Sequence, residues 1–168
     1  MCQMEANDRV AFLEANLTRQ LHWTSAADSK VAFGFTVNTA MLGLLAAVAP
    51  STSAGWTTAP AVCASFAVAF GITGLLFLSF ASFPRTEGPR GSLLFFGGIA
   101  QRDSEQFKSA VLSLSQEAYI DDLSVQCHRN AEIAARKFAW VQRALICLYL
   151  SVIPWGLSLW LLYGRPAP

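Results

Sequence analysis

Two long stretches of the chain carry no charged side chain and no histidine. Asp, Glu, Lys, Arg and His are absent from residues 31–83 and again from residues 144–164. The hydrocarbon core of a bilayer is about 30 Å thick, and roughly 20 apolar helical residues are needed to cross it. Each stretch is therefore long enough to contain at least one membrane span.

The first stretch is long enough for two spans. Its middle, "APSTSAGWTTAP" (49–60), gathers Pro, Ser, Thr and Gly and therefore predicts a turn. Apolar runs remain at 31–49 and 59–83, and the second stretch supplies a third span at 144–163. These runs predict an all-α membrane protein with three transmembrane helices, whose two termini lie on opposite sides of the bilayer.

Amphipathic helices are expected next to the first and third spans, and continuous with them. The first carries apolar residues at helical spacing at Val10, Leu13, Leu17, Leu21, Ala27 and Val31. Before the third span, an approximate heptad seam consists of Ile120, Leu123, Cys127, Asn130, Ala134, Phe138 and Val141. Because no Gly or Pro follows until Pro154, nothing in the sequence ends this helix at the membrane surface.

The chain is thus expected to have four segments. Residues 1–30 form a cytosolic amphipathic helix, 31–83 a two-span transmembrane hairpin, 84–143 a cytosolic helical segment, and 144–168 the third transmembrane helix with a short tail. Within the middle segment, "PRTEGPRGS" (84–92) predicts a hinge. Asp103 or Ser104 can cap a short helix, and Ser115 can begin the next one.

The basic residues predict the orientation, because cytoplasmic flanks retain Lys and Arg. Arg9, Arg19 and Lys30 precede the first span, and eight further Lys or Arg residues lie between Arg85 and Arg143. The turn at 49–60 has none. We therefore expect a cytoplasmic amino terminus and a cytoplasmic middle segment. The chain is 54% hydrophobic, only 14% charged and has a net charge of +1, so no nucleic-acid partner is indicated.

No set of residues indicates an enzyme or a metal centre. His22 and His128 have no nucleophile beside them in the sequence, and a helix points adjacent Asp121 and Asp122 in different directions. Gly97 and Gly98 are too short a run to hold phosphates. The four cysteines are scattered without metal-ligand spacing. We therefore expect no catalytic residues, no metal and no cofactor.

The middle segment contains candidates for binding a small phosphorylated ligand. Arginine binds phosphate well, and an aromatic ring such as Phe95, Phe96 or Tyr119 can stack on a base. The ligand or gating candidates are Arg85, Arg90, Phe96, Arg102, Arg136 and Lys137. Most of the positive charge is also explained by the inside-positive bias and by attraction to anionic lipid.

Two residues within the spans are candidates for gating. Asn38 is strongly polar, so it should lie in a helix interface, either lining a pore or forming an interhelical hydrogen bond worth about 1 kcal/mol. Pro154 offers a kink halfway along the third span, or is simply tolerated there. At the membrane entry, Asp28 and Lys30 form either a headgroup collar or a salt bridge to Arg85, Arg136 or Lys137.

Four separated blocks occur in a familiar order. They are "AADSKVAFGFTVN" (26–38), "FPR" (83–85), "LLFFGGIA" (93–100) and "EIAARKFAWVQRA" (132–144). Together they resemble the Pycsar transmembrane effector family, from about His22 to the end of the third span. The pair Gly97 and Gly98 departs from the "GD" that is frequent in the family.

The resemblance implies a function that periodicity cannot show. Family members resemble the effector half of a bacterial antiphage, abortive-infection system, in which a partner pyrimidine cyclase makes cyclic CMP or cyclic UMP. The effector senses this nucleotide and impairs the inner membrane. This implies a multi-pass inner-membrane protein with residues 84–143 as the sensor. A cytosolic segment of roughly 60 residues is barely a domain, so we expect the ligand site to form between copies of a homo-oligomer. The alternatives are a membrane adaptor that recruits a cytosolic enzyme through its two apolar stripes, or an ungated, holin-like pore.

Overall fold

The computed structural model describes residues 5–84, 88–89 and 91–163. These residues form the helices α1 (Ala6–Val48), α2 (Thr58–Ser82), α3 (Phe96–Ala100), α4 (Ser104–Leu112) and α5 (Gln116–Tyr163), with a short 3-10 turn, η1 (Ser53–Gly55). No strand is assigned in these described ranges. Three helices, α1, α2 and α5, are long and apolar enough to cross a membrane, which confirms the predicted fold class.

The two longest helices extend well beyond a membrane span. α1 has 43 residues and α5 has 48, and each joins an amphipathic stretch to a predicted span without interruption. At about 1.5 Å per residue, α5 is about 72 Å long, more than twice the hydrocarbon thickness. Helix assignment continues from Arg136 to Leu145 and through Pro154. One helix therefore joins a polar stretch to a candidate membrane span.

Local sequence explains where the shorter helices begin and end. α2 accepts Pro60 in its first turn, where the amide has no partner within the helix. It stops at Phe83, whose extended conformation is favoured by the proline that follows. Asp103, one of the two predicted caps, caps α4 in a reciprocal capping box with Gln106. The hydroxyl of Ser115 accepts a hydrogen bond from the amide of Ala118 at the start of α5.

The chain divides into two compact units. We call Met1–Ala26 with Pro84–Arg136 the polar unit, and Ala27–Phe83 with Lys137–Pro168 the span unit. The polar unit contains the first part of α1, all of α3 and α4, and the first part of α5. The span unit contains α2 and the remaining parts of α1 and α5.

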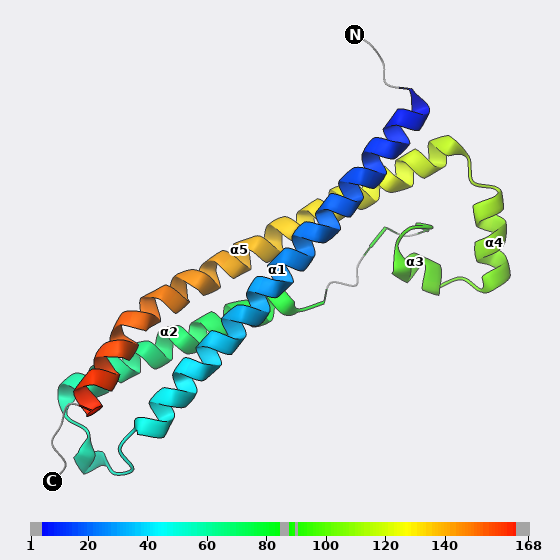
Figure 1. Ribbon diagram of the computed structural model, residues 1–168. Coiled ribbons are helices and arrows are strands. Elements are labelled where there is room, and N and C mark those ends of the chain that lie inside the picture. Colours follow the sequence, from blue (N-terminus) through cyan, green and yellow to red (C-terminus); the bar gives the residue numbers. More distant parts are fainter. Residues whose placement is uncertain (1–4, 85–87, 90, 164–168) are drawn as a thin grey trace. The chain divides into compact units, whose positions relative to one another are not determined.

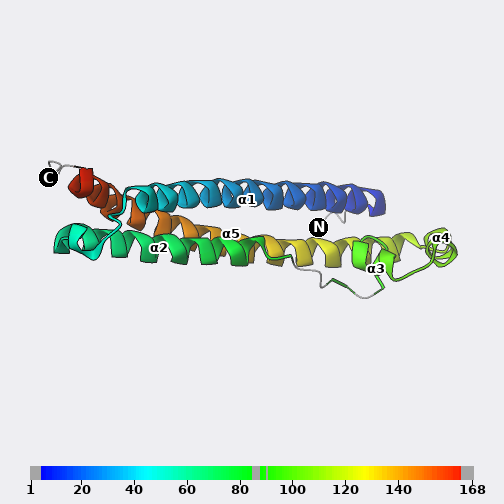
Figure 2. The ribbon, with the colours of Figure 1, turned by 90° about the horizontal axis from the view of Figure 1, so that it is seen from below.

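In the span unit, α2 lies alongside α1 and α5 (Figures 1 and 2). The shared core consists of Val31, Leu78, Ala81, Val141 and Ala144. Gly34 allows a close contact, because a Cβ there would lie 3.0 Å from a methyl group of Leu78. Small residues let transmembrane helices approach closely, and close packing is what holds them together in lipid.

In the polar unit, the first part of α1 packs against the first part of α5. The thiol of Cys127 donates to the carbonyl oxygen of Leu13 at 3.4 Å. Leu123, about one turn earlier in α5, is buried as well. Burial raises the pKa of the Cys127 thiol. The heptad seam predicted on α5 is thus the packed face of that helix.

The seam predicted on α1 was wrong at one position. Leu21 is 54% exposed, whereas its neighbour Gln20 is only 5% exposed. From Leu17 onward the inward face follows alternating steps of three and four, through Gln20, Thr24, Ala27 and Val31. A step of four residues from Leu17 reaches the apolar Leu21, but at this point of the helix that step passes beyond the inward face. The polar residues Gln20 and Thr24 therefore occupy inward positions.

A network of hydrogen bonds fixes the loop between residues 91 and 103. The guanidinium of Arg102 donates to the carbonyl oxygens of Gly91, Ser92 and Gly98 at 2.6 to 3.0 Å. The Ser92 hydroxyl accepts from Gln126 of α5, and the Leu93 amide donates to Asp122. α3 is thus tied to α5 by side chains rather than by a large apolar core.

Gly98 is required where α3 passes this loop. A Cβ at Gly98 would lie 2.5 Å from the carbonyl oxygen of Ser92, which itself accepts from Arg102. The Ser92 carbonyl cannot move away from an added methyl group without weakening its hydrogen bond from Arg102. The backbone at Gly98 cannot move away either, because its own carbonyl accepts from Arg102.

We predict that Gly98→Ala destabilises the polar unit by about 1–3 kcal/mol, the usual cost of overpacking. Hydrogen exchange measured by mass spectrometry should show faster exchange in residues 91–103. Gly43→Ala is the matched control, since no atom lies within 4 Å of a Cβ placed there. Equal protection in Gly98→Ala and the unmodified protein would contradict this account of the loop.

Candidate functional site

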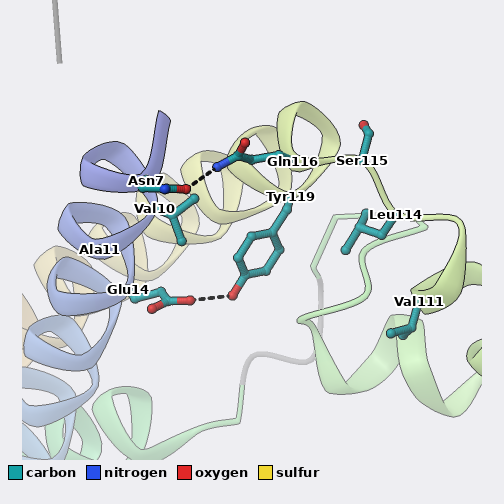
Figure 3. Close-up of a pocket in the computed structure, with 9 residues that line it drawn as sticks. All are labelled: Asn7, Val10, Ala11, Glu14, Val111, Leu114, Ser115, Gln116 and Tyr119. Atoms are coloured by element: carbon teal, nitrogen blue, oxygen red, sulfur yellow. Dashed lines mark hydrogen bonds between the residues drawn. The ribbon is translucent and has the colours of Figure 1, made fainter. Parts of the chain in front are cut away.

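The polar unit has a surface pocket where α1 meets the connection between α4 and α5 (Figure 3). Its volume is about 450 Å³. Nine residues line it: Asn7, Val10, Ala11, Glu14, Val111, Leu114, Ser115, Gln116 and Tyr119. The ring of Tyr119 points towards α1, and Val111 and Leu114 lie on the other side of the pocket. The pocket therefore combines an aromatic ring, an apolar wall and several hydrogen-bonding groups.

Two hydrogen bonds hold its polar side. The Tyr119 hydroxyl donates to Glu14 Oε1 at 2.7 Å, and the Gln116 amide donates to Asn7 Oδ1 at 2.8 Å. The hydrogen bond to Glu14 raises the pKa of Tyr119, with smaller contributions from burial and from the negative charges of Glu14 and Asp122. The phenol therefore stays protonated, and remains a donor, throughout the neutral pH range.

The lining favours a neutral, planar, polar group over an anion. Glu14 is the charged residue of the lining, and none of the nine lining residues is Lys or Arg. A phosphate beside Glu14 would be repelled and would have no cation among these residues to neutralise it. A base-like ring that stacks on Tyr119 and bonds to the amides of Asn7 and Gln116 suits the lining better.

None of the predicted ligand or gating residues is in the lining of this pocket. Arg102 uses three of its N–H groups on backbone carbonyls, so its main contribution in this structure is to shape the loop. Arg136 is exposed on α5. Phe96 is 63% exposed, and the centroid of its ring lies 4.6 Å from the centroid of the Phe95 ring. Arg85 and Arg90 lie outside the described residues. No hydrogen bond or ion pair joins any two of Phe96, Arg102, Arg136 and Lys137 in the described part of the chain.

Lys137 forms an ion pair at the polar end of the span unit. Its Nζ lies 2.5 Å from Asp28 Oδ1, which joins α5 to α1. The Lys137 side chain is only 13% exposed, whereas that of Asp28 is 52% exposed. The sequence offered three partners for a salt bridge at this position, and the structure shows the pair between Asp28 and Lys137. The Lys30 ammonium instead lies 5.4 Å from the centre of the Phe138 ring.

Asn38 lies where the three helices of the span unit meet. A Cβ on Gly74 of α2 would lie 3.5 Å from each of three atoms: Asn38 Nδ2, the Ala144 carbonyl oxygen and Cys147 Cβ. Asn38 is 1% exposed, which confirms that it occupies a helix interface. Its Nδ2 donates to Gly34 within α1 at 3.2 Å, and its buried Oδ1 has no partner among the described atoms.

Sequence reasoning missed a hydrogen bond that joins two of the spans. The Trp155 indole N–H, next to Pro154, donates to the Met41 carbonyl oxygen at 2.9 Å. The signal was present, because a tryptophan deep in a span must find an acceptor for its N–H. Pro154 lies within α5 and is half-buried. The described residues contain no group of three His, Cys, Asp or Glu side chains that could hold a metal.

Comparison with known proteins decides the family. Residues 12–162 match the family described as the Pycsar effector protein domain, PycTM. The chain belongs to the Pycsar effector family. Pycsar effector protein PtPycTM of Propioniciclava tarda is 32% identical over 65 residues, a match covering 36% of this chain and 32% of that protein. The matched region is thus about one third of the length of this relative. No solved structure matches.

The extent of the match agrees with the architecture. In this Pycsar effector, the matched region includes α2, α3 and α4 in full, together with most of α1 and α5. Both units and all three candidate membrane spans therefore belong to the family domain. The family resemblance seen in the four sequence blocks is confirmed.

We predict that Asn38→Leu does not destabilise the span unit. An unpaired buried polar atom costs about 1–3 kcal/mol, whereas a hydrogen bond within membrane-embedded helices contributes about 0.6 kcal/mol on average. The free energy of unfolding in detergent should stay the same or rise by about 1 kcal/mol. In the comparison variant Leu78→Ala, a fully buried core residue, it should fall by about 2–5 kcal/mol.

A fall of about 2 kcal/mol or more in Asn38→Leu would contradict this prediction. It would mean that Asn38 Oδ1 finds a partner in the assembled protein, such as a water molecule or a neighbouring copy.

Proposed function

We propose that this chain is a membrane effector of bacterial antiphage defence. It senses a cyclic pyrimidine mononucleotide, cyclic CMP or cyclic UMP, made by a partner cyclase, and then disrupts the inner membrane. Membership of the Pycsar effector family and the three candidate membrane spans support this proposal. The observation that carries it is that α1 and α5 each join a polar stretch to a span in one helix.

The pairing of α1 with α5 supplies a means of transmission. In the polar unit Asn7 bonds to Gln116, and in the span unit Asp28 bonds to Lys137. Both pairs are 109 residues apart, so the helices run parallel with the same register in each unit. A ligand that changes this register in the polar unit would alter the same two helices where they enter the membrane.

The polar unit provides the ligand contacts in this proposal. Exposed Arg136, together with Arg85 and Arg90, supplies positive charge for the single phosphate. Phe96 supplies a stacking surface, held in place by the loop that Arg102 organises. The pocket beside Tyr119 is a second place for the base, because its lining suits a neutral ring. No metal or further cofactor is needed for binding.

The span unit provides the gate. Asn38 and Pro154 lie in the helices that would repack, and the Asp28–Lys137 ion pair closes them at one end. Moving a population from 1:99 to 99:1 needs about 5.5 kcal/mol of differential binding. Several ligands acting on a homo-oligomer supply this more readily than one ligand on one chain. Phe12 and Trp23, which are exposed and eleven residues apart on the same face of α1, are suited to such self-association.

The orientation in this proposal follows the basic residues. The amino terminus and the polar unit face the cytoplasm, where a cyclase product would be made. The adaptor alternative is less well supported, because the stripe on α5 that would recruit an enzyme packs against α1, with Leu123 and Cys127 buried.

Dye release from liposomes containing the purified full chain tests the proposal. We predict release on addition of cyclic CMP or cyclic UMP and no release with cyclic AMP. Asp28→Asn removes the ion pair, which as a partly exposed pair contributes about 0.2–1 kcal/mol, so the nucleotide concentration for half-maximal release should fall by up to about fivefold. The exchange Asp28→Lys with Lys137→Asp should restore the original value.

Release that is the same with and without either pyrimidine nucleotide would overturn the proposal and favour an ungated pore. If release responds to the nucleotide but its half-maximal concentration is unchanged in Asp28→Asn, nucleotide sensing stands and the proposal that the ion pair is part of the gate is contradicted.

A further inference from the structure

A groove on the span unit lies between the polar end of its α1 segment and the adjoining part of α5. Its volume is about 300 Å³. Lys30 of α1 lines it, together with the α5 residues Phe138, Gln142, Leu145, Ile146 and Tyr149. Lys30 and Gln142 are polar, whereas the lining further along α5 is formed by aliphatic and aromatic side chains. From Gln142 to Tyr149 the helix advances about 10 Å, so the groove changes from polar to apolar along the direction of the span.

Lys30, the charged residue of the lining, makes the polar end of this groove positive. The described charged residues of the span unit are Asp28, Lys30, Lys137 and Arg143. Asp28 pairs with Lys137, which leaves Lys30 and Arg143 without an acidic partner in the described part of this unit. Their cations lie over aromatic rings instead, Lys30 over Phe138 and Arg143 over Trp140. An aromatic face stabilises a cation, but it does not neutralise the charge.

The apolar part of the groove is open to its surroundings. Ile146 is 50% exposed and Tyr149 is 69% exposed. In a transmembrane helix such side chains contact lipid acyl chains. An occupant that satisfies the whole groove must therefore carry a negative group at one end and a hydrocarbon chain at the other.

We infer that this groove binds an anionic phospholipid. The phosphate and its headgroup lie at Lys30, and an acyl chain follows Leu145, Ile146 and Tyr149 along α5. A second copy of the chain fits less well, because Asp28, the acid nearest to Lys30 in the sequence, already pairs with Lys137, and residues 31–83 and 144–163 contain no acid. The lipid would contact α1 and α5 together at their entry into the bilayer. This inference does not depend on nucleotide sensing.

Native mass spectrometry of the full chain in detergent tests the inference. With phosphatidylglycerol and phosphatidylcholine supplied in equal amounts, the protein should retain the anionic lipid preferentially. Lys30→Gln should reduce that preference by about fivefold, the factor that about 1 kcal/mol per lysine corresponds to. Lys108→Gln is the matched control, because this exposed residue on α4 belongs to the polar unit and should leave the preference unchanged.

Two further arms separate the possible sources of binding. Ile146→Trp fills the groove and should reduce retention of both lipids, whereas glycerol phosphate in excess should not displace the lipid if the acyl chain contributes. Equal retention of the two lipids by the unmodified protein, or an equal loss in Lys30→Gln and Lys108→Gln, would overturn the inference. Displacement by glycerol phosphate would overturn it in favour of a free-anion site.

Discussion

The parallel pairing of α1 with α5 is the interaction on which the rest of the structure depends. In the polar unit it rests on Leu13, Cys127 and the Tyr119–Glu14 hydrogen bond. In the span unit it rests on the Asp28–Lys137 ion pair and the bond from Trp155 to Met41. Contacts that follow a heptad seam recur along both helices, so successive turns each add to the stability of the interface. α2 completes the span unit, and α3 and α4 complete the polar unit.

The two units use different physical chemistry to hold the same pair of helices. The polar unit has few buried apolar side chains, and hydrogen bonds from Arg102, Gln126 and Asp122 hold its loop in place. The span unit has small residues, close helix approach and a buried Asn38 oxygen that has no partner among the described atoms. An interface that already carries such a cost is separated from an alternative packing by less free energy, which is consistent with the rearrangement that we propose.

Much of the architecture could be predicted from sequence, because charge-free runs and helical periodicity follow directly from bilayer thickness and helix geometry. The three spans, the turn after residue 48 and the Asp103 cap are examples. The prediction that Leu21 faces inward was wrong. Steps of three and of four residues both fit a helical face, so local spacing does not decide between the adjacent residues Gln20 and Leu21. The ion pair needed the structure to choose among Arg85, Arg136 and Lys137. The pocket beside Tyr119 and the carbonyl cluster around Arg102 depend on how the loops turn, which apolar spacing does not encode.

The central claim is that α1 and α5 change their pairing when the polar unit binds its ligand. The direct measurement is dye release from liposomes containing a variant that keeps the buried Cys127 and Cys147, carries Cys2→Ser and Cys63→Ser, and has Asp28→Cys and Lys137→Cys joined by a short reducible cross-linker, compared before and after reduction. The account predicts that the cross-linked protein binds the pyrimidine nucleotide but releases no dye, and that reduction restores release. Equal nucleotide-dependent release from the cross-linked and reduced forms would contradict it.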